Sequence, residues 1–177
     1  MYPYLRMMKE IIKNRKAPPL AFDEVHVSHH RVWLSDIDQF IELNNGRTLM
    51  LYDLGRVPMG LRVGLSGAMR ANCWGMAVAG ACVRYRRRLR PFEKFEMRTR
   101  GLGWDERFFY IDQQIWKQDG ECANHAVFRT AVTDRNGIVP TAKVIAAIDS
   151  NAENKPLPDW VQDWLEAEDN RPWPPQR

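Results

Sequence analysis

The distribution of apolar residues predicts helices in the first half of the chain and strands in the second. Near the N-terminus, apolar residues recur at helical spacing and basic residues fill much of the remainder, until Pro18 and Pro19 end the pattern. This segment is expected to form a short, basic amphipathic helix that either packs on the folded domain or makes weak contact with a membrane surface. Its apolar positions are Tyr4, Leu5, Met8, Ile11 and Ile12.

A second helix is predicted after an extended segment. Residues 25–34 alternate and are rich in β-branched and aromatic side chains, which is typical of a strand. Asn44 or Asn45 is a suitable N-cap for the helix that follows, and Gly55 or Pro58 is expected to end it. Its buried stripe is expected to include Leu49, Tyr52, Leu54 and Val57.

The remaining pattern indicates an antiparallel sheet. A less regular helical piece over residues 61–69 is expected to form the mouth of a pocket. Asp119 and Asn136 each precede a glycine and predict hairpin turns. Strands are expected over residues 76–85, 95–100, 107–116 and 122–133, a strand or short helix over residues 140–148, and a helix over residues 157–165. One helical excursion followed by a meander of strands favours an α+β fold.

The length and hydrophobic content suit one compact domain with extensions. The chain has 177 residues, 45% of them hydrophobic, which is enough to build a core. We expect an N-terminal helix and linker over residues 1–22, a main domain over residues 23–150, and a C-terminal helix with a Pro-rich tail over residues 151–177.

Cysteine usage and hydropathy point to the cytoplasm. The three cysteines form an odd count without a C-x-x-C pair, so neither a disulfide framework nor a zinc ribbon is indicated. No apolar run approaches the roughly 20 residues needed to cross a bilayer, and the N-terminus lacks the apolar core of a signal peptide. A cytoplasmic, soluble protein is expected.

Carboxylates and asparagines gather just before the second helix. Asp36, Asp38 and Glu42 precede the pair Asn44 and Asn45, where the helix is predicted to begin. The first N–H groups of a helix lack intrahelical partners and can stabilise a developing oxyanion. A nearby carboxylate can attack a carbonyl or activate water, although a carboxylate here can also simply complement the helix dipole.

Much of the net charge of +4 lies in residues 84–90. Strand alternation would place Arg84, Arg86, Arg88 and Arg90 on one side. Arginine suits bidentate contact with phosphate, so a ligand with several phosphates is one interpretation and a solvated or intersubunit ion-pair face is another. Nucleic acid is disfavoured because the chain lacks the stacking aromatics and loops of the usual nucleic-acid-binding proteins.

The histidines do not indicate a metal site or a catalytic triad. His29 would face away from His26 and His30 on a strand, which leaves two ligands without a supporting acid. His125 lies in a predicted strand, and the chain has no G-x-S-x-G nucleophile elbow. We therefore expect no metal.

Two sequence blocks resemble a known family. The pattern D-x-D-x-x-x-(H/E)-x-N-N-x-R, followed by L-x-x-x-D-x-x-R, begins at Asp36, and a second block runs from Val83 to Tyr110. Both resemble the hotdog-fold acyl-CoA thioesterases of the 4-hydroxybenzoyl-CoA thioesterase-like superfamily, and most closely the branch of thioesterase superfamily member six. The resemblance covers about residues 25–148 and implies a helix wrapped by a curved antiparallel sheet.

The resemblance also implies an active site. It assigns Asp38 as the nucleophile or general base and the backbone N–H of Asn45 as the donor to the thioester carbonyl, with Asn44 holding the turn. Most members of this family have His where this chain has Glu42, so Glu42 is a candidate to orient water or the leaving thiolate. Asp36 is expected to be structural.

The expected function is hydrolysis of an acyl-CoA to a free acid and coenzyme A. Coenzyme A is part of the substrate, with Arg84, Arg86 and Arg88 as candidate phosphate contacts, and no separate cofactor is expected. Hotdog relatives imply a homodimer or homotetramer with active sites between subunits. The substitution at Glu42 leaves one alternative, a catalytically silent hotdog module that binds acyl-CoA or lipid.

Overall fold

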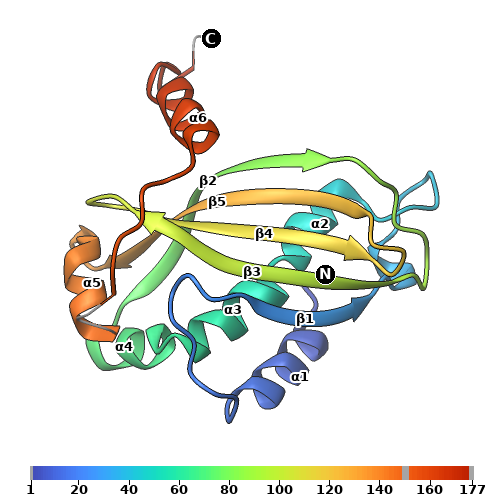
Figure 1. Cartoon of the computed structure of the whole chain (residues 1–177), viewed down its shortest axis with the longest axis horizontal. Helices are drawn as coiled ribbons and strands as arrows, with labels where there is room; N and C mark the ends of the chain where they lie inside the picture. The colour runs from blue at the N-terminus through green and yellow to red at the C-terminus, as the bar shows by residue number, and fades with distance from the viewer. Residues whose placement is uncertain (1, 149–151, 176–177) are drawn as a thin grey trace.

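A six-stranded antiparallel sheet curls around a central helix (Figure 1). The structure is a computed structural model that describes residues 2–148 and 152–175. The strand order is β1-β3-β4-β5-β2, and β6 pairs with β5. The α+β class is therefore confirmed. The strands are β1 (His26–Arg31), β2 (Gly75–Tyr85), β3 (Lys94–Trp104), β4 (Phe109–Lys117), β5 (Cys122–Asp134) and β6 (Gly137–Ile138).

Helices cover the concave face, one end and part of the outer face of the sheet (Figure 1). They are α1 (Tyr4–Asn14), α2 (Asn45–Leu51), α3 (Asp53–Arg62), α4 (Leu65–Asn72), α5 (Thr141–Ile148) and α6 (Asp159–Asp169), and a 3-10 turn covers Leu34–Asp36. Residues 140–148 are thus mainly helical. None of the helices in residues 2–148 and 152–175 combines the length and apolarity of a membrane span.

The central helix is longer than its sequence suggests. Tyr52 joins α2 to α3 with right-handed helical angles (φ −59°, ψ −23°), so the helix continues from Asn45 to Arg62. The predicted end near Gly55 or Pro58 is wrong. A proline inside a helix removes one hydrogen bond and crowds the preceding turn, at a cost of about 3 kcal/mol. Pro58 is buried within α3, and the packing of this helix against the sheet offsets that cost.

Gly55 has a packing role instead of a terminating one. A Cβ atom placed on Gly55 would lie 2.3 Å from Oγ1 of Thr99 in β3. The helix backbone therefore approaches the sheet at a distance that only glycine permits.

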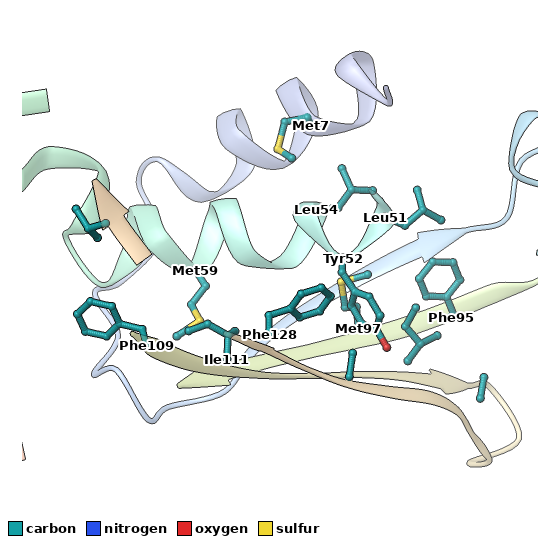
Figure 2. Close-up of a cluster of buried hydrophobic side chains, with 14 of the residues drawn as sticks. Met7, Leu51, Tyr52, Leu54, Met59, Phe95, Met97, Phe109, Ile111 and Phe128 are labelled. Carbon is teal, nitrogen blue, oxygen red and sulfur yellow. The ribbon is translucent and has the colours of Figure 1, made fainter. Parts of the chain in front are cut away.

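The core lies on both sides of the central helix (Figure 2). Tyr52 and Met59 point toward the sheet, whereas Leu54 points toward Met7 of α1. Because α1 covers the second face of the helix, the buried stripe is wider than predicted. Leu51 is fully buried, while the predicted core residue Leu49 is 37% exposed.

The orientation of α1 differs from that of an ordinary amphipathic helix. The side chains it buries are Arg6, Met7, Glu10 and Asn14. Its large exposed apolar side chains are Tyr4, Leu5, Met8 and Ile12, all at least 59% exposed. Helix α1 thus packs on the domain mainly through a polar face, and most of its apolar face points outward.

The predicted C-terminal helix is present as α6 and packs on part of the outer face of the sheet. Val161 is fully buried in a cluster with Tyr110 of β4 and Val127 of β5. Trp164 approaches Gly80 of β2. The expected domain boundary at residues 150–151 lies outside the described residues.

Candidate active site

Asp36 anchors the turn that leads into the central helix. Its carboxylate accepts hydrogen bonds from the Trp33 N–H (2.9 Å), Nη1 of Arg6 (2.6 Å) and Nε of Arg47 (2.7 Å). Burial acts to raise the pKa of this carboxyl, but the Trp33 N–H and the two guanidinium groups hold it below its ordinary value. Asp36 is fully buried and has the structural role expected for it.

Asp38 lies in a tight turn beside this anchor. Its carboxylate accepts the Phe40 N–H at 2.8 Å, and its own N–H donates to the Glu42 carbonyl at 2.9 Å. The chain closes this turn by a β-bridge between Ile37 and Leu43. The Asp38 carboxylate therefore sits in the segment that precedes the central helix.

Asn44 caps the central helix. Its backbone is extended, and its side-chain oxygen accepts the Arg47 N–H at 2.9 Å. This makes Asn45 the first helical residue, whose N–H lacks an intrahelical acceptor. The backbone geometry therefore suits the oxyanion role that the resemblance gives Asn45.

A cavity of about 250 Å³ opens at this end of the helix. It brings together four of the predicted site residues, Glu42, Asn45, Arg86 and Arg88. Asp38, Asn44 and Arg84 do not line it. The other lining residues are Leu43, Thr48, Tyr85, Arg87, Leu89 and Asn124.

Two polar contacts at this cavity could not be anticipated from sequence patterns. The Tyr85 hydroxyl donates to the Asn45 carbonyl at 3.0 Å, which ties the end of β2 to the first turn of α2. The buried Tyr52 hydroxyl donates to Oδ1 of Asn124 in β5. Both join residues at least 40 positions apart. The only sequence feature that points to the Tyr85 contact is the position of this tyrosine at the end of a predicted strand.

The arginine segment leaves the sheet earlier than predicted. Strand β2 ends at Tyr85, so strand alternation does not extend over Arg86, Arg88 and Arg90. Nε of Arg88 lies 2.8 Å from Oε2 of Glu42, a charge contact without the alignment of a hydrogen bond. Arg86 forms no ion pair within the described part of the chain and is available to a ligand.

A second, apolar cavity of about 40 Å³ lies near the other end of the central helix. Its walls come from α3, α4, α5 and the sheet, and include Met59, Leu65, Phe109, Val132 and Val144. Val63 and Leu65 in its wall fall within residues 61–69, the segment predicted to border a pocket. In residues 2–148 and 152–175, no group of three or more His, Cys, Asp or Glu side chains is placed to hold a metal ion.

Comparison with known proteins identifies the family. The family model of the thioesterase-like superfamily matches residues 32–165, about three quarters of the chain. The chain therefore belongs to this superfamily. Its solved structural neighbours are hotdog-fold thioesterases, which confirms the predicted hotdog fold.

One relative by sequence and two solved structures illustrate the similarity. Protein THEM6 of zebrafish is 44% identical over 95 residues, which cover 53% of this chain and 47% of that protein. The chain thus matches about half the length of this relative. The probable thioesterase YbaW from Escherichia coli has a TM-score of 0.64 at 14% identity, covering 72% of this chain and 98% of that one. Protein SAV2348 from Staphylococcus aureus, solved in complex with CoA, has a TM-score of 0.62 at 13% identity, covering 80% and 94%.

Proposed function

We propose that this protein hydrolyses an acyl-CoA thioester to a free acid and coenzyme A. The observation that carries the proposal is the cavity at the start of the central helix, which is lined by Asn45, Glu42 and Arg86. Membership of the thioesterase-like superfamily and likeness to a protein solved with CoA support it.

In the proposed reaction the thioester carbonyl oxygen accepts a hydrogen bond from the Asn45 N–H, which has no acceptor within the helix. The helix N-terminus stabilises the negative charge that develops on this oxygen. A carboxylate either attacks the carbonyl carbon, so that the C–S bond breaks and an anhydride forms for water to hydrolyse, or removes a proton from the attacking water. The thiolate is a good leaving group and does not depend on a strong acid.

Two carboxylates are candidates for this step. Asp38 is the stronger candidate for the nucleophile or general base, because it matches the catalytic position of the family pattern. Glu42 lines the cavity directly, in contact with Arg88. In our proposal Asp38 performs the chemistry and Glu42 orients the water or the thiolate.

The phosphates of CoA are proposed to lie along the arginine segment. Arg86 and Arg88 line the cavity, and Arg84 is exposed at the end of β2. One guanidinium group can donate two parallel hydrogen bonds to two oxygens of the same phosphate. No separate cofactor is part of the proposed reaction.

The functional unit is proposed to be a homodimer or homotetramer. Strand β2 is an edge of the sheet, and Met76 and Val78 on it are 41% and 51% exposed. At the other edge, α1 approaches β1, where Arg6 donates to the Arg31 carbonyl. Because unpaired edges invite strand addition, we propose that β2 meets a second copy.

We propose a cytoplasmic location with weak contact between α1 and a membrane surface. The cytoplasmic part rests on the odd number of cysteines without a pairing pattern. The membrane part rests on the outward apolar face of α1, flanked by Lys9 and Lys13.

The alternative is a catalytically silent module that binds acyl-CoA or lipid. It is favoured by Glu42, which stands where most family members have His. A thiol-release assay over short, long and aromatic acyl-CoAs tests both functions. We expect turnover that falls about 100-fold or more in Asp38→Asn, while CoA binding by calorimetry is retained. Binding without turnover in the parent protein would establish the silent module.

A further inference from the structure

A groove lies between α1 and the β1 edge of the sheet, separate from both the cavity at Asn45 and the apolar cavity. It has a volume of about 780 Å³ and is formed by α1, β1, β3 and the β4–β5 turn. Six lysine or arginine side chains line it and only two acids, Glu10 and Glu96. Trp33 and Trp116 contribute apolar surface.

Two of the groove cations oppose each other without an acidic partner. Arg31 and Lys94 form a direct cross-strand pair between β1 and β3, and both are exposed. Like charges directly opposite in a sheet are destabilising. Neither side chain forms an ion pair in residues 2–148 and 152–175, and the same holds for Lys9 of α1. An anionic ligand would relieve this repulsion.

The groove also contains a buried polar group without a partner. Glu10 is only 2% exposed, and its Oε2 makes no hydrogen bond in the described structure. An unsatisfied buried oxygen costs about 1–3 kcal/mol, and a helix position facing a protein body is ordinarily apolar. Burial raises the pKa of Glu10, against the opposing effects of Lys13, Lys9 and Arg6. The carboxyl therefore retains a proton more readily than an ordinary glutamate and can donate it to an oxygen acceptor.

We propose that this groove is a second binding site, for a ligand that carries a phosphate group. Lys9, Arg31 and Lys94 hold the phosphate, and Glu10 donates a hydrogen bond to one of its oxygens. The phosphate belongs either to a soluble ligand or to a lipid headgroup. Lys9 lies both in this groove and beside the apolar face of α1, so a headgroup can reach the groove from a membrane.

Calorimetry of the full chain tests the site with two kinds of probe. The soluble probes are inorganic phosphate and ADP, and the membrane probe is a vesicle of phosphatidylglycerol in phosphatidylcholine. We expect at least one kind to bind, with a dissociation constant raised tenfold or more in Arg31→Ser/Lys94→Ser. The matched control is Arg70→Ser/Arg135→Ser, which removes two exposed charges outside the groove and should change the constant less than twofold.

The two probes distinguish the source of the phosphate. Binding of phosphate or ADP that the groove variant weakens identifies a soluble ligand, whereas binding of vesicles alone, weakened in the same variant, identifies a headgroup. The proposal is overturned if neither kind of probe binds, if binding is unchanged in the groove variant, or if the groove variant and the control weaken it equally.

Glu10 provides an independent measurement. Glu10→Leu removes an unpartnered buried carboxyl, so we expect its melting temperature to rise while its binding of whichever probe the parent binds weakens at least threefold. Glu10→Gln keeps a hydrogen-bond donor and should bind more tightly than Glu10→Leu. A variant Glu10→Leu that binds like the parent removes Glu10 from the site. Thiol release from a short pantetheine thioester serves as a separate control and should stay unchanged in all groove variants.

Discussion

The Tyr85 hydroxyl donates a hydrogen bond to the Asn45 carbonyl, 3.0 Å away, and so couples the edge strand β2 to the first turn of the central helix. Asn45 is the residue whose N–H is proposed to hold the thioester oxygen. The position of this N–H therefore depends on a side chain at the end of the strand that is proposed to meet a second subunit.

Removal of the Tyr85 hydroxyl should impair catalysis more than stability. Tyr85→Phe removes one partly exposed hydrogen bond, worth about 1 kcal/mol. We expect kcat to fall roughly tenfold, because the helix N-terminus is no longer held in place, while KM changes little. Thiol-release kinetics and urea denaturation on the same sample separate the two effects. A loss of stability with unchanged kcat would show that the contact serves the fold alone.

Asp36 should be essential for stability. Asp36→Asn leaves Arg6 and Arg47 without their carboxylate, and breaking a buried ion pair typically costs about 3–5 kcal/mol. Asp38→Asn is the matched control, since its amide oxygen can still accept the Phe40 N–H, and its change should stay within about 0.5 kcal/mol. Urea denaturation measures both variants. Similar losses in the two would contradict the division between a structural and a catalytic aspartate.

The extended segment, the cap and the turns of this fold could be predicted because they depend on local chemistry. Asn44 caps a helix through its own side chain, and Asp119 with Gly120 forms a turn through local backbone preferences. The catalytic role proposed for Asp38 does not follow from such local chemistry and rests on the family pattern alone.

Contacts between distant segments could not be predicted in this way. Pro58 and Gly55 look like helix breakers, but the sheet below them holds the helix through close approach at Thr99. The apolar face of α1 looks like a core face, but Asp36 draws Arg6 inward and turns most of that face outward. In both cases tertiary packing outweighs a local preference.

Two buried histidines should make the protein sensitive to acid. Burial, with nearby cations, lowers the pKa of His26 to about 4 and that of His30 to about 3. In the unfolded chain the pKa of a histidine is about 6.5. Below that pH the unfolded state takes up protons that the folded state does not, so stability falls as the pH drops toward 4. The slope should reach about 1.4 kcal/mol per pH unit for each histidine.

Urea denaturation at pH 7, 6 and 5 measures this slope. Ser28→Ala/His30→Phe removes one titrating group together with its hydrogen-bond partner and should reduce the slope by about half. Ser28→Ala alone is the control, because it removes the hydrogen-bond partner but keeps both buried histidines, and it should keep the slope of the parent. An unchanged slope in the double variant would assign the acid sensitivity to other groups.

A charge on the β2 edge should disrupt the proposed oligomer. In Val78→Glu the same negative charge would appear on both copies across a two-fold axis, where like charges repel. We expect light scattering to show a shift from dimer or tetramer to monomer. Val27→Glu on β1, the opposite edge strand, has a similarly exposed parent residue at 41% and should keep the parent mass. A monomeric parent protein with full activity would refute the oligomer altogether.

The Glu42 and Arg88 pair allows chemistry to be separated from substrate binding. The pair is largely open to solvent on the arginine side, so its loss should change stability by no more than about 1 kcal/mol. Arg88→Gln should raise KM for CoA thioesters but not for pantetheine thioesters, because only the former carry the nucleotide phosphates. Glu42→Gln should lower kcat about tenfold on both substrates, because the proposed role of Glu42 is to orient the water or the thiolate, which both reactions share. Glu42→His, which introduces the residue that the family resemblance implies at this position, should retain more activity than Glu42→Ala. If kcat is unchanged in every Glu42 variant but lost in Asp38→Asn, the chemistry belongs to Asp38 alone and Glu42 only positions Arg88.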